Sequence, residues 1–183
     1  MKKIHFFATL ILFCWIPNIF AFTSVHLSGG LIGEPERLRG ARVSITDNWN
    51  WQLPSADQQW QLHGYWDYSL AYWYTQISVS GAPSSLVAVA AAPVLRLEKI
   101  NSTYLKPFLE ASVGAVLLSH SHLGHRNVGS QLNFQDMLGV GTYFGDKQQY
   151  ELSGHYLHYS NANIFPPNNG IDIKLLLTLA YHL

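Results

Sequence analysis

Cysteine, charge and long apolar runs are all scarce in this chain, and each scarcity excludes a class of protein. The 183 residues contain one cysteine, Cys14, which lies in the N-terminal apolar run. A mature chain without this run has no disulfide, no cysteine-ligated metal and no cysteine nucleophile. Charged residues make up 12 % of the sequence, with no basic patch of the kind that binds nucleic acid. Beyond the N-terminal run, no apolar segment is long enough for a membrane-spanning helix.

The N-terminus has the features of a secretory signal peptide. Two lysines precede an apolar run from Ile4 to Phe20, and Ala21 is a small residue of the kind that cleavage requires. A transmembrane anchor is the other interpretation, but the run is short for one, and polar, strand-like sequence follows it. We therefore expect residues 1–21 to be removed and residues 22–183 to form one domain. Without those two lysines, acidic residues slightly outnumber basic ones.

Aromatic residues are abundant, at 14 % of the chain, and they alternate with polar residues. From Trp60 onward the even positions are apolar and rich in aromatics, whereas the odd positions are mostly polar. Residues 84–100 and 104–119 repeat this alternation, which is typical of membrane strands with one face toward lipid and one toward the lumen. The parity predicts a lumen with charges of both signs, which can pair there. These are Asp67, Glu98, Glu110, Arg96, Lys106 and Lys174.

Eight such segments predict an all-β fold, an eight-stranded antiparallel transmembrane β-barrel in the outer membrane of a Gram-negative bacterium. The expected strands are residues 24–33, 40–51, 59–75, 84–100, 104–119, 131–145, 149–160 and 171–183. Short turns alternate with longer loops, and in such barrels the short turns face the periplasm. A barrel of eight strands is filled by its own side chains, so we expect no transport pore.

A histidine and a serine stand two residues apart at the end of the seventh segment, within His158–Ala162. Because side chains alternate along a strand with a period of two, both point to the outward face, where neither gains from packing against lipid. Asp172 follows across a turn, so that a nucleophile, a base and an acid suited to acyl transfer are close in sequence. The other interpretation is that these residues belong to the interfacial girdle, where His, Tyr and Ser need no function.

The order of several short motifs resembles the lipid A 3-O-deacylase (PagL) family. The matching pieces are Leu62–Asp67 with Tyr72-Trp73, Ala92-Pro93-Val94, Lys106–Ala111, Leu132–Phe134 with Asp136 and Gly139–Gly141, and His158–Ala162 with its continuation to Asp172. The last piece is the most specific, and together they follow the family order over most of residues 22–183. The resemblance implies an outer-membrane esterase that removes an ester-linked 3-hydroxyacyl chain, expected at position 3, from lipid A of lipopolysaccharide.

Carried onto this chain, the resemblance assigns Ser160 as the nucleophile and His158 as the general base. Asp172 would orient the imidazole, and Asn161 would help to hold the oxyanion. The site would lie at the outer leaflet and use no metal or other cofactor. Its partners would be lipopolysaccharide and the outer membrane, not nucleic acid, and a homodimer is left open.

Two departures leave the identity of the acid open. A family member chosen for comparison has Glu at the position of Asp172. The apolar residues of the last segment are the odd-numbered ones, which puts Asp172 on the inward face unless a bulge near Gly170 turns it outward. Asp136 is the alternative acid, because it shares the outward face of the sixth strand. Pairing through the turn at residues 145–148 would set it beside His158.

Two other functions compete with the esterase. A non-enzymatic small barrel, structural or adhesive, would tolerate replacement of His158 and Ser160. An acyltransferase could use the same nucleophile, but it would need an acyl-sized slot, for which the charged lumen leaves no room.

Two loop features are also open to a simple interpretation as solvated side chains. Arg126 could otherwise pair with a phosphate, and the histidines at positions 120, 122 and 125 have no matching carboxylate or cysteine for a metal site.

Overall fold

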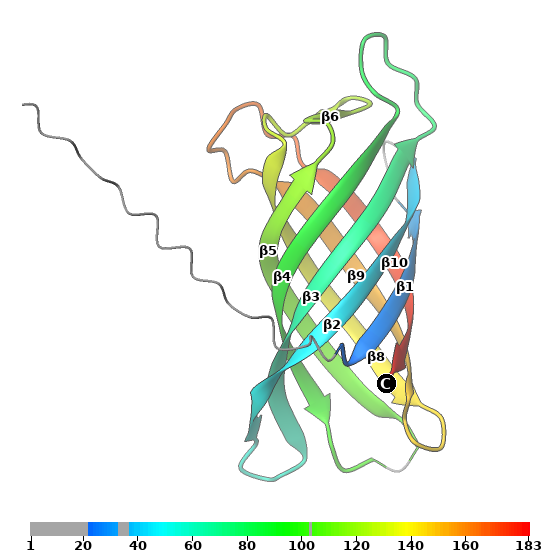
Figure 1. The fold of residues 1–183 in the computed structure, drawn as a ribbon, viewed down its shortest axis with the longest axis vertical. Helices are drawn as coiled ribbons and strands as arrows, with labels where there is room; N and C mark the ends of the chain where they lie inside the picture. Colours follow the sequence, from blue (N-terminus) through cyan, green and yellow to red (C-terminus); the bar gives the residue numbers. More distant parts are fainter. Residues whose placement is uncertain (1–21, 33–36, 103) are drawn as a thin grey trace, which may run out of the picture.

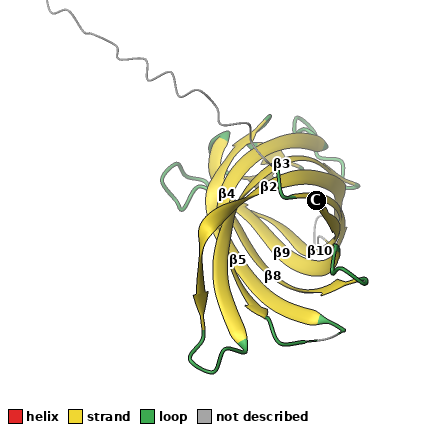
Figure 2. Cartoon of the chain, turned by 60° about the horizontal axis from the view of Figure 1, so that its bottom comes forward, coloured by secondary structure: helices red, strands yellow, loops and turns green. Residues whose placement is uncertain are grey.

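The protein is a closed barrel of eight antiparallel strands (Figures 1 and 2). This computed structural model describes residues 22–32, 37–102 and 104–183, so the expected signal peptide at 1–21 lies outside the described residues. The strands are β1 (Ser24–Ile32), β2 (Leu38–Pro54), β3 (Trp60–Thr75), β4 (Ser85–Lys99), β5 (Lys106–Leu118), β8 (Leu132–Phe144), β9 (Tyr150–Ser160) and β10 (Ile171–His182). β1 pairs with β10, with Ser24 opposite His182, and this pairing closes the barrel. The prediction of an eight-stranded antiparallel barrel is confirmed.

The expected strands match the observed ones to within a few residues at each end. The main difference is two short strands, β6 (His122–Leu123) and β7 (Arg126–Asn127), which pair inside a segment that we expected to be a loop. Strands of two residues are too short to show an alternating pattern, so the sequence gives no signal for them. Within the described ranges, no helix has the length and apolarity needed to cross a membrane.

The connections at the two ends of the barrel differ in length. Two short turns, at residues 55–59 and 145–149, are each closed by backbone hydrogen bonds, including one of 2.9 Å from Gln148 N to Gly145 O. The long connections, at 76–84, 119–131 and 161–170, gather at the opposite end, uppermost in Figure 1. The C-terminus lies at the end with the turns (Figure 1). In a membrane barrel the end with long loops faces the cell exterior.

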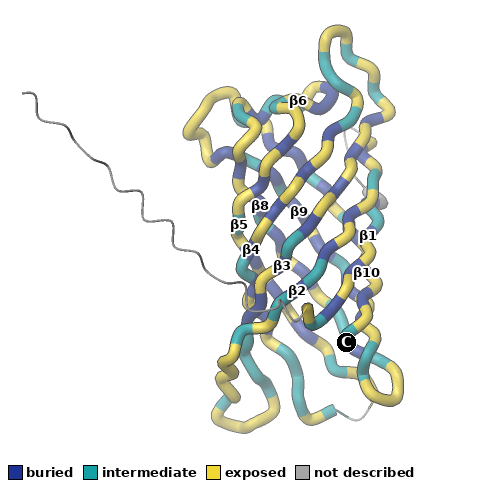
Figure 3. The backbone as a smooth tube through the Cα atoms, in the orientation of Figure 1, coloured by how far each residue is buried: buried dark blue, intermediate teal, exposed yellow. Residues whose placement is uncertain are grey.

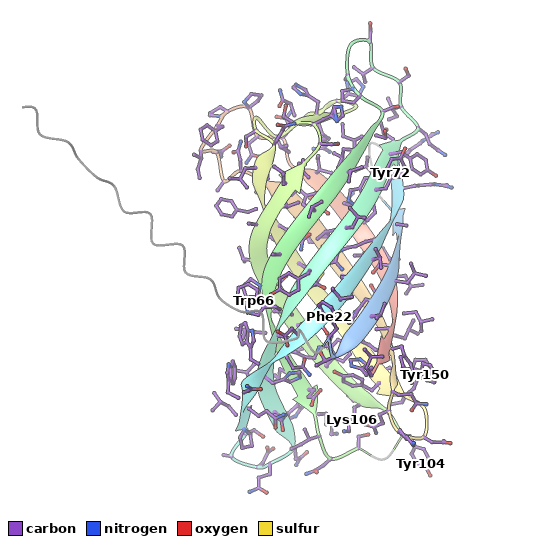
Figure 4. All side chains as sticks on the ribbon, in the orientation of Figure 1. Phe22, Trp66, Tyr72, Tyr104, Lys106 and Tyr150 are labelled. Atoms are coloured by element: carbon purple, nitrogen blue, oxygen red, sulfur yellow. The ribbon has the colours of Figure 1, made fainter. Side chains whose placement is uncertain are left out.

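Burial alternates along most of the length of the barrel strands, as Figure 3 shows. Trp73 and Val94 are fully buried, whereas Leu70 and Val89 on the outer face are each about half exposed. Side chains such as Trp66 and Tyr72 project from the outside of the wall (Figure 4). The apolar face therefore points outward, as lipid requires, and the polar face points into the lumen.

Arg96 is the centre of the luminal polar network, and its side chain is 1 % exposed. Its guanidinium lies 2.7 Å (Nε) from Glu110 Oε2 and 2.8 Å (Nη1) from Glu151 Oε2. His155 Nε2 lies 2.6 Å from the other oxygen of Glu110. Tyr65 donates a hydrogen bond to the same carboxylate. Because opposite charges meet directly, the lumen can hold them without water.

Five of the six predicted luminal charges lie on the inner side of the wall, and two residues that we did not include, Arg42 and Glu151, join them. Arg42 forms an ion pair with Asp67. Lys106 and Glu98 line a polar pocket of 290 Å³ at the turn end of the lumen. Lys174 is the exception, because it is exposed on the outside of β10, and its predicted luminal position is wrong.

A β-bulge in β10 explains this error. Ile173 pairs with Leu157 of β9, but the next paired residue of β10, Leu176, is opposite His155, so β10 holds one extra residue. When one strand of a pair holds an extra residue, the side chains beyond that residue point to the opposite face from the one that strict alternation predicts.

The bulge reverses the parity expected for the start of the strand. Ile171 and Ile173 are buried in the lumen, and Asp172, between them, takes the outward face with Lys174. The inward position that parity alone suggested for Asp172 is therefore wrong. The bulge that we named as the alternative exists, but at residues 174–175 instead of near Gly170.

Replacement of Arg96 by methionine should destabilise the barrel. The substitution removes the cation that lies between the buried carboxylates of Glu110 and Glu151, and removing one partner of a buried ion pair typically costs about 3–5 kcal/mol. Urea unfolding in detergent micelles measures this loss. The matched control is Lys147→Met in the exposed turn, expected to change the free energy of unfolding by less than about 0.5 kcal/mol. Equal losses in both variants would contradict a structural role for the luminal network.

Candidate active site

His158 lies on the outward face of β9, between two carboxylates on the neighbouring strands. It is directly opposite Asp172 of β10 and Asp136 of β8 in the strand pairing. The hydrogen bond goes to Asp172, with 2.8 Å between His158 Nδ1 and Asp172 Oδ1. The side chains of this pair are about one quarter exposed, so the pair is open to the surface of the wall. The bulge in β10 makes the contact, because it turns Asp172 outward.

Two further residues confine the imidazole ring of His158. The ring of Tyr156 is stacked on it, with 6.4 Å between centroids and an interplanar angle of 10°, and the Tyr156 hydroxyl donates a hydrogen bond to Asp172 Oδ1. Gly170 has a φ of +63°, and a Cβ added there would lie 2.6 Å from His158 Cε1. The sequence gives no sign of either role, because Tyr156 fits the apolar stripe of β9 and a glycine before a strand has no distinctive pattern.

Ser160 is the last residue of β9 and shares the outward face with His158. Its side chain is half-buried, and its strand partner on β8 is Phe134. In the part of the chain that the structure describes, no hydrogen bond joins Ser160 Oγ to His158. Contacts between a nucleophile and its base are often long without substrate and tighten when substrate binds.

Asn161 follows Ser160 and is 2 % exposed. Its side-chain amide donates hydrogen bonds of 2.6 Å to the carbonyl oxygens of Val128 and Phe165. Its backbone N–H donates to Asn168 Oδ1 at 3.2 Å. In this arrangement Asn161 joins two loops, and a role in holding the oxyanion stays a prediction that requires release of one of these bonds.

The loops at 119–131 and 161–170 are fastened to each other beside His158. Asn169 N donates to Asn127 O at 2.9 Å, and Arg126 Nη1 donates to Asn169 O at 2.9 Å. Figure 1 shows the two loops side by side above β5 and β9. Arg126 is close enough for its charge to act on the Asp172 carboxylate. A cation is thus held at the loop end of the site.

An apolar pocket lies near Ser160, and the next residue along the chain, Asn161, forms part of its lining. It has a volume of 160 Å³ and is lined mainly by Ala115, Leu132, Phe134, Ile164 and Phe165. Phe134 is the strand partner of Ser160, which places the pocket beside the serine. A larger groove of 580 Å³ on the outside of the wall shares Ala115 and Leu132 with it. The two hollows have the shape and chemistry to hold a hydrocarbon chain.

The remaining candidates stand apart from this arrangement. Asp136 is half-buried opposite His158, yet Asp172 is the carboxylate that makes the hydrogen bond. His120 and His122 each form a hydrogen bond with the serine that precedes them in the chain. Across the residues that the structure describes, no group of three or more His, Cys, Asp or Glu side chains is placed to hold a metal ion.

Comparison with known proteins gives relatives of the same fold and of similar sequence. A protein named lipid A deacylase PagL from Pseudomonas aeruginosa is 31 % identical over 163 residues, which cover 83 % of this chain and 88 % of the relative. A protein of the same name from Bordetella bronchiseptica is 32 % identical over 111 residues, which cover 61 % of this chain and 57 % of that protein.

Solved structures also match the barrel. The outer membrane enzyme PagL superposes with a TM-score of 0.74 at 27 % identity, over 87 % of this chain and 99 % of that one. Neisserial surface protein A matches with a TM-score of 0.53 at 11 % identity, over 88 % of this chain and 96 % of its own, which shows a shared fold alone.

The family model described as lipid A 3-O-deacylase (PagL) matches residues 39–182, from β2 to the end of β10. This range contains His158, Ser160, Asp172 and both loops of the site. The chain therefore belongs to the lipid A 3-O-deacylase (PagL) family.

Proposed function

We propose that this protein is an outer-membrane esterase that hydrolyses the ester-linked 3-hydroxyacyl chain at position 3 of lipid A. Ser160 is the nucleophile, His158 the general base and Asp172 the acid that orients it. The observation that carries the proposal is the hydrogen bond between His158 and Asp172 on the lipid-facing wall. An imidazole that is oriented by a carboxylate and stands two residues from a serine is the machinery of acyl transfer.

The relatives support this reaction, because both curated ones are named lipid A deacylases. The fold by itself does not decide the function, since Neisserial surface protein A has the same architecture. A non-enzymatic barrel would have no need of an oriented histidine beside a serine on its lipid-facing side. A homodimer stays a prediction, and the proposal requires only residues of one chain.

The reaction would proceed in two steps. With its Nδ1 proton donated to Asp172, His158 has Nε2 free to accept the proton of the Ser160 hydroxyl as Oγ attacks the ester carbonyl. The carbon–oxygen bond to the sugar then breaks, and His158 returns the proton to the leaving sugar hydroxyl. Water, activated in the same way, hydrolyses the acyl-serine and releases a 3-hydroxy fatty acid. Asp172 stabilises the imidazolium that forms in each step.

Substrate would reach the site laterally from the outer leaflet. The pocket beside Ser160 and the groove that continues from it suit the acyl chain, because most of the residues that line them are apolar. The joined loops lie above the site, where a lipid headgroup would be. Arg126, held there by Asn169, is suited to a headgroup phosphate, because a guanidinium pairs with phosphate through two parallel hydrogen bonds.

Mass spectrometry of lipid A incubated with detergent-purified protein tests the proposed reaction. We expect loss of one 3-hydroxyacyl mass with the wild type, and no loss with Ser160→Ala or His158→Ala. Removal of a single member of a catalytic triad can abolish most of the rate enhancement. The control is Ser55→Ala in the distant turn at residues 55–59, which should remain active. Full activity of Ser160→Ala would exclude this serine as the nucleophile.

Asp172→Asn and Asp136→Asn, measured side by side, test which carboxylate orients His158. We expect Asp172→Asn to lower kcat the more strongly, by up to about 10⁴-fold, the loss seen when the orienting acid of a serine protease triad is replaced by its amide. Asp136→Asn leaves the hydrogen bond between His158 and Asp172 in place, so its kcat should fall much less. The reverse order would assign the orienting role to Asp136.

A further inference from the structure

We infer that Tyr156 is a positioning residue that fixes Asp172 and the imidazole of His158 in their working geometry. The inference rests on the proposed function and adds a residue to its site. Tyr156 is on the outward face of β9 and is 43 % exposed. Its hydroxyl nevertheless donates to Asp172 Oδ1, the oxygen that also accepts from His158 Nδ1. One carboxylate oxygen thus ties the tyrosine to the histidine.

The β10 bulge explains why this tyrosine reaches the carboxylate. Leu157 and His155 have partners on β10, whereas Tyr156, between them, faces the two bulged residues 174 and 175. Asp172 is then the diagonal neighbour of Tyr156, a distance that a long aromatic side chain can span. The ring of Tyr156 also lies nearly parallel to the imidazole, with 6.4 Å between the two centroids. A carboxylate held only by His158 would be free to rotate toward solvent.

Tyr156→Phe keeps the stacked ring and removes only the hydroxyl, so it separates the two contributions. We expect kcat to fall about tenfold with KM unchanged, as for loss of one hydrogen bond to a charged group. The matched control is Tyr150→Phe, another exposed tyrosine on the same face of β9. In an Asp172→Ala background, Tyr156→Phe should have no further effect, because the acceptor of its hydroxyl is already gone. Equal losses in both backgrounds, or a kcat within twofold of wild type, would overturn the inference.

A second measurement does not depend on turnover. In protein with ¹⁵N-labelled histidine, the Nδ1–H proton of His158 should give a low-field resonance, assigned by its absence from His158→Ala. We expect this resonance to broaden or shift in Tyr156→Phe and to persist in Tyr150→Phe. An identical resonance in the wild type and Tyr156→Phe would show that the tyrosine does not hold the pair, whether or not the lipid is hydrolysed.

We also propose, from an independent observation, that Lys174 binds a phosphate of the lipid substrate. The bulge places this lysine on the lipid-facing side of β10, two residues from Asp172 on the same face. Among the described residues it makes no hydrogen bond or ion pair. A lysine facing lipid is costly unless its ammonium reaches an anion or the interface, and such residues commonly have a function.

The position of Lys174 suits a headgroup contact. Two residues of strand span about 6.6 Å, so the lysine stem can lie along the wall and extend toward the end with the loops. Arg126 lies on the loop side of Asp172, and Lys174 lies on the membrane side. Together they would flank the ester with two cations, an arrangement that suits a lipid with phosphate groups.

Lipid binding to Ser160→Ala in nanodiscs tests this contact without turnover, so its result is separate from that of the proposed reaction. Adding Lys174→Ala should raise the Kd for phosphorylated lipid A by up to about fivefold, the upper range for an exposed ion pair. The Kd for phosphatase-treated lipid A should not change, and Lys174→Arg should bind normally. Lys147→Ala, in an exposed turn at the far end, is the control. An equal change with both lipids, or none with either, would overturn the proposal.

Discussion

The bulge in β10 is the constraint on which the candidate site depends. Because side chains alternate along a strand with a period of two, one extra residue exchanges the inner and outer faces on one side of the insertion. Beyond the bulge, the strand keeps the parity that fills the lumen with Leu176 and Thr178. Before it, the opposite parity carries Asp172 outward to His158. A barrel without the extra residue would have the same strands and no oriented histidine on its surface.

The lumen has a different task, which is to make the wall rigid. Arg96, Glu110 and Glu151 pair in the interior, where the guanidinium lies between the two carboxylates. Such a filled barrel holds its outer surface in a fixed shape, and a site on a rigid strand needs little further support. The polar groups of this protein therefore divide by role. Those inside stabilise the fold, and those outside, around His158, meet the lipid.

The two long loops complete the site from above. Asn161 reaches the carbonyls of Val128 and Phe165, and Asn169 is bonded to Asn127 and Arg126. These contacts hold Ile164 and Phe165 over the apolar pocket next to Ser160. Residues far apart in sequence thus place an apolar hollow, the Ser160 hydroxyl and the Arg126 cation within one small region of the wall. This arrangement suits a substrate that has both acyl chains and charged headgroups.

The sequence by itself determined the barrel, its eight strands and the outward faces of His158 and Ser160, because alternation is a local property that each strand carries. It also named Asp172 and Asp136 as the two possible acids. Only the tertiary structure decided which of the two forms the hydrogen bond to His158. The reason is that the register of β10 against β9 is a property of the strand pairing and not of either strand alone. For the same reason the sequence misplaced Lys174 and gave no sign of the contacts of Tyr156, Gly170 and Asn161. Those contacts join segments whose proximity exists only once the barrel is closed.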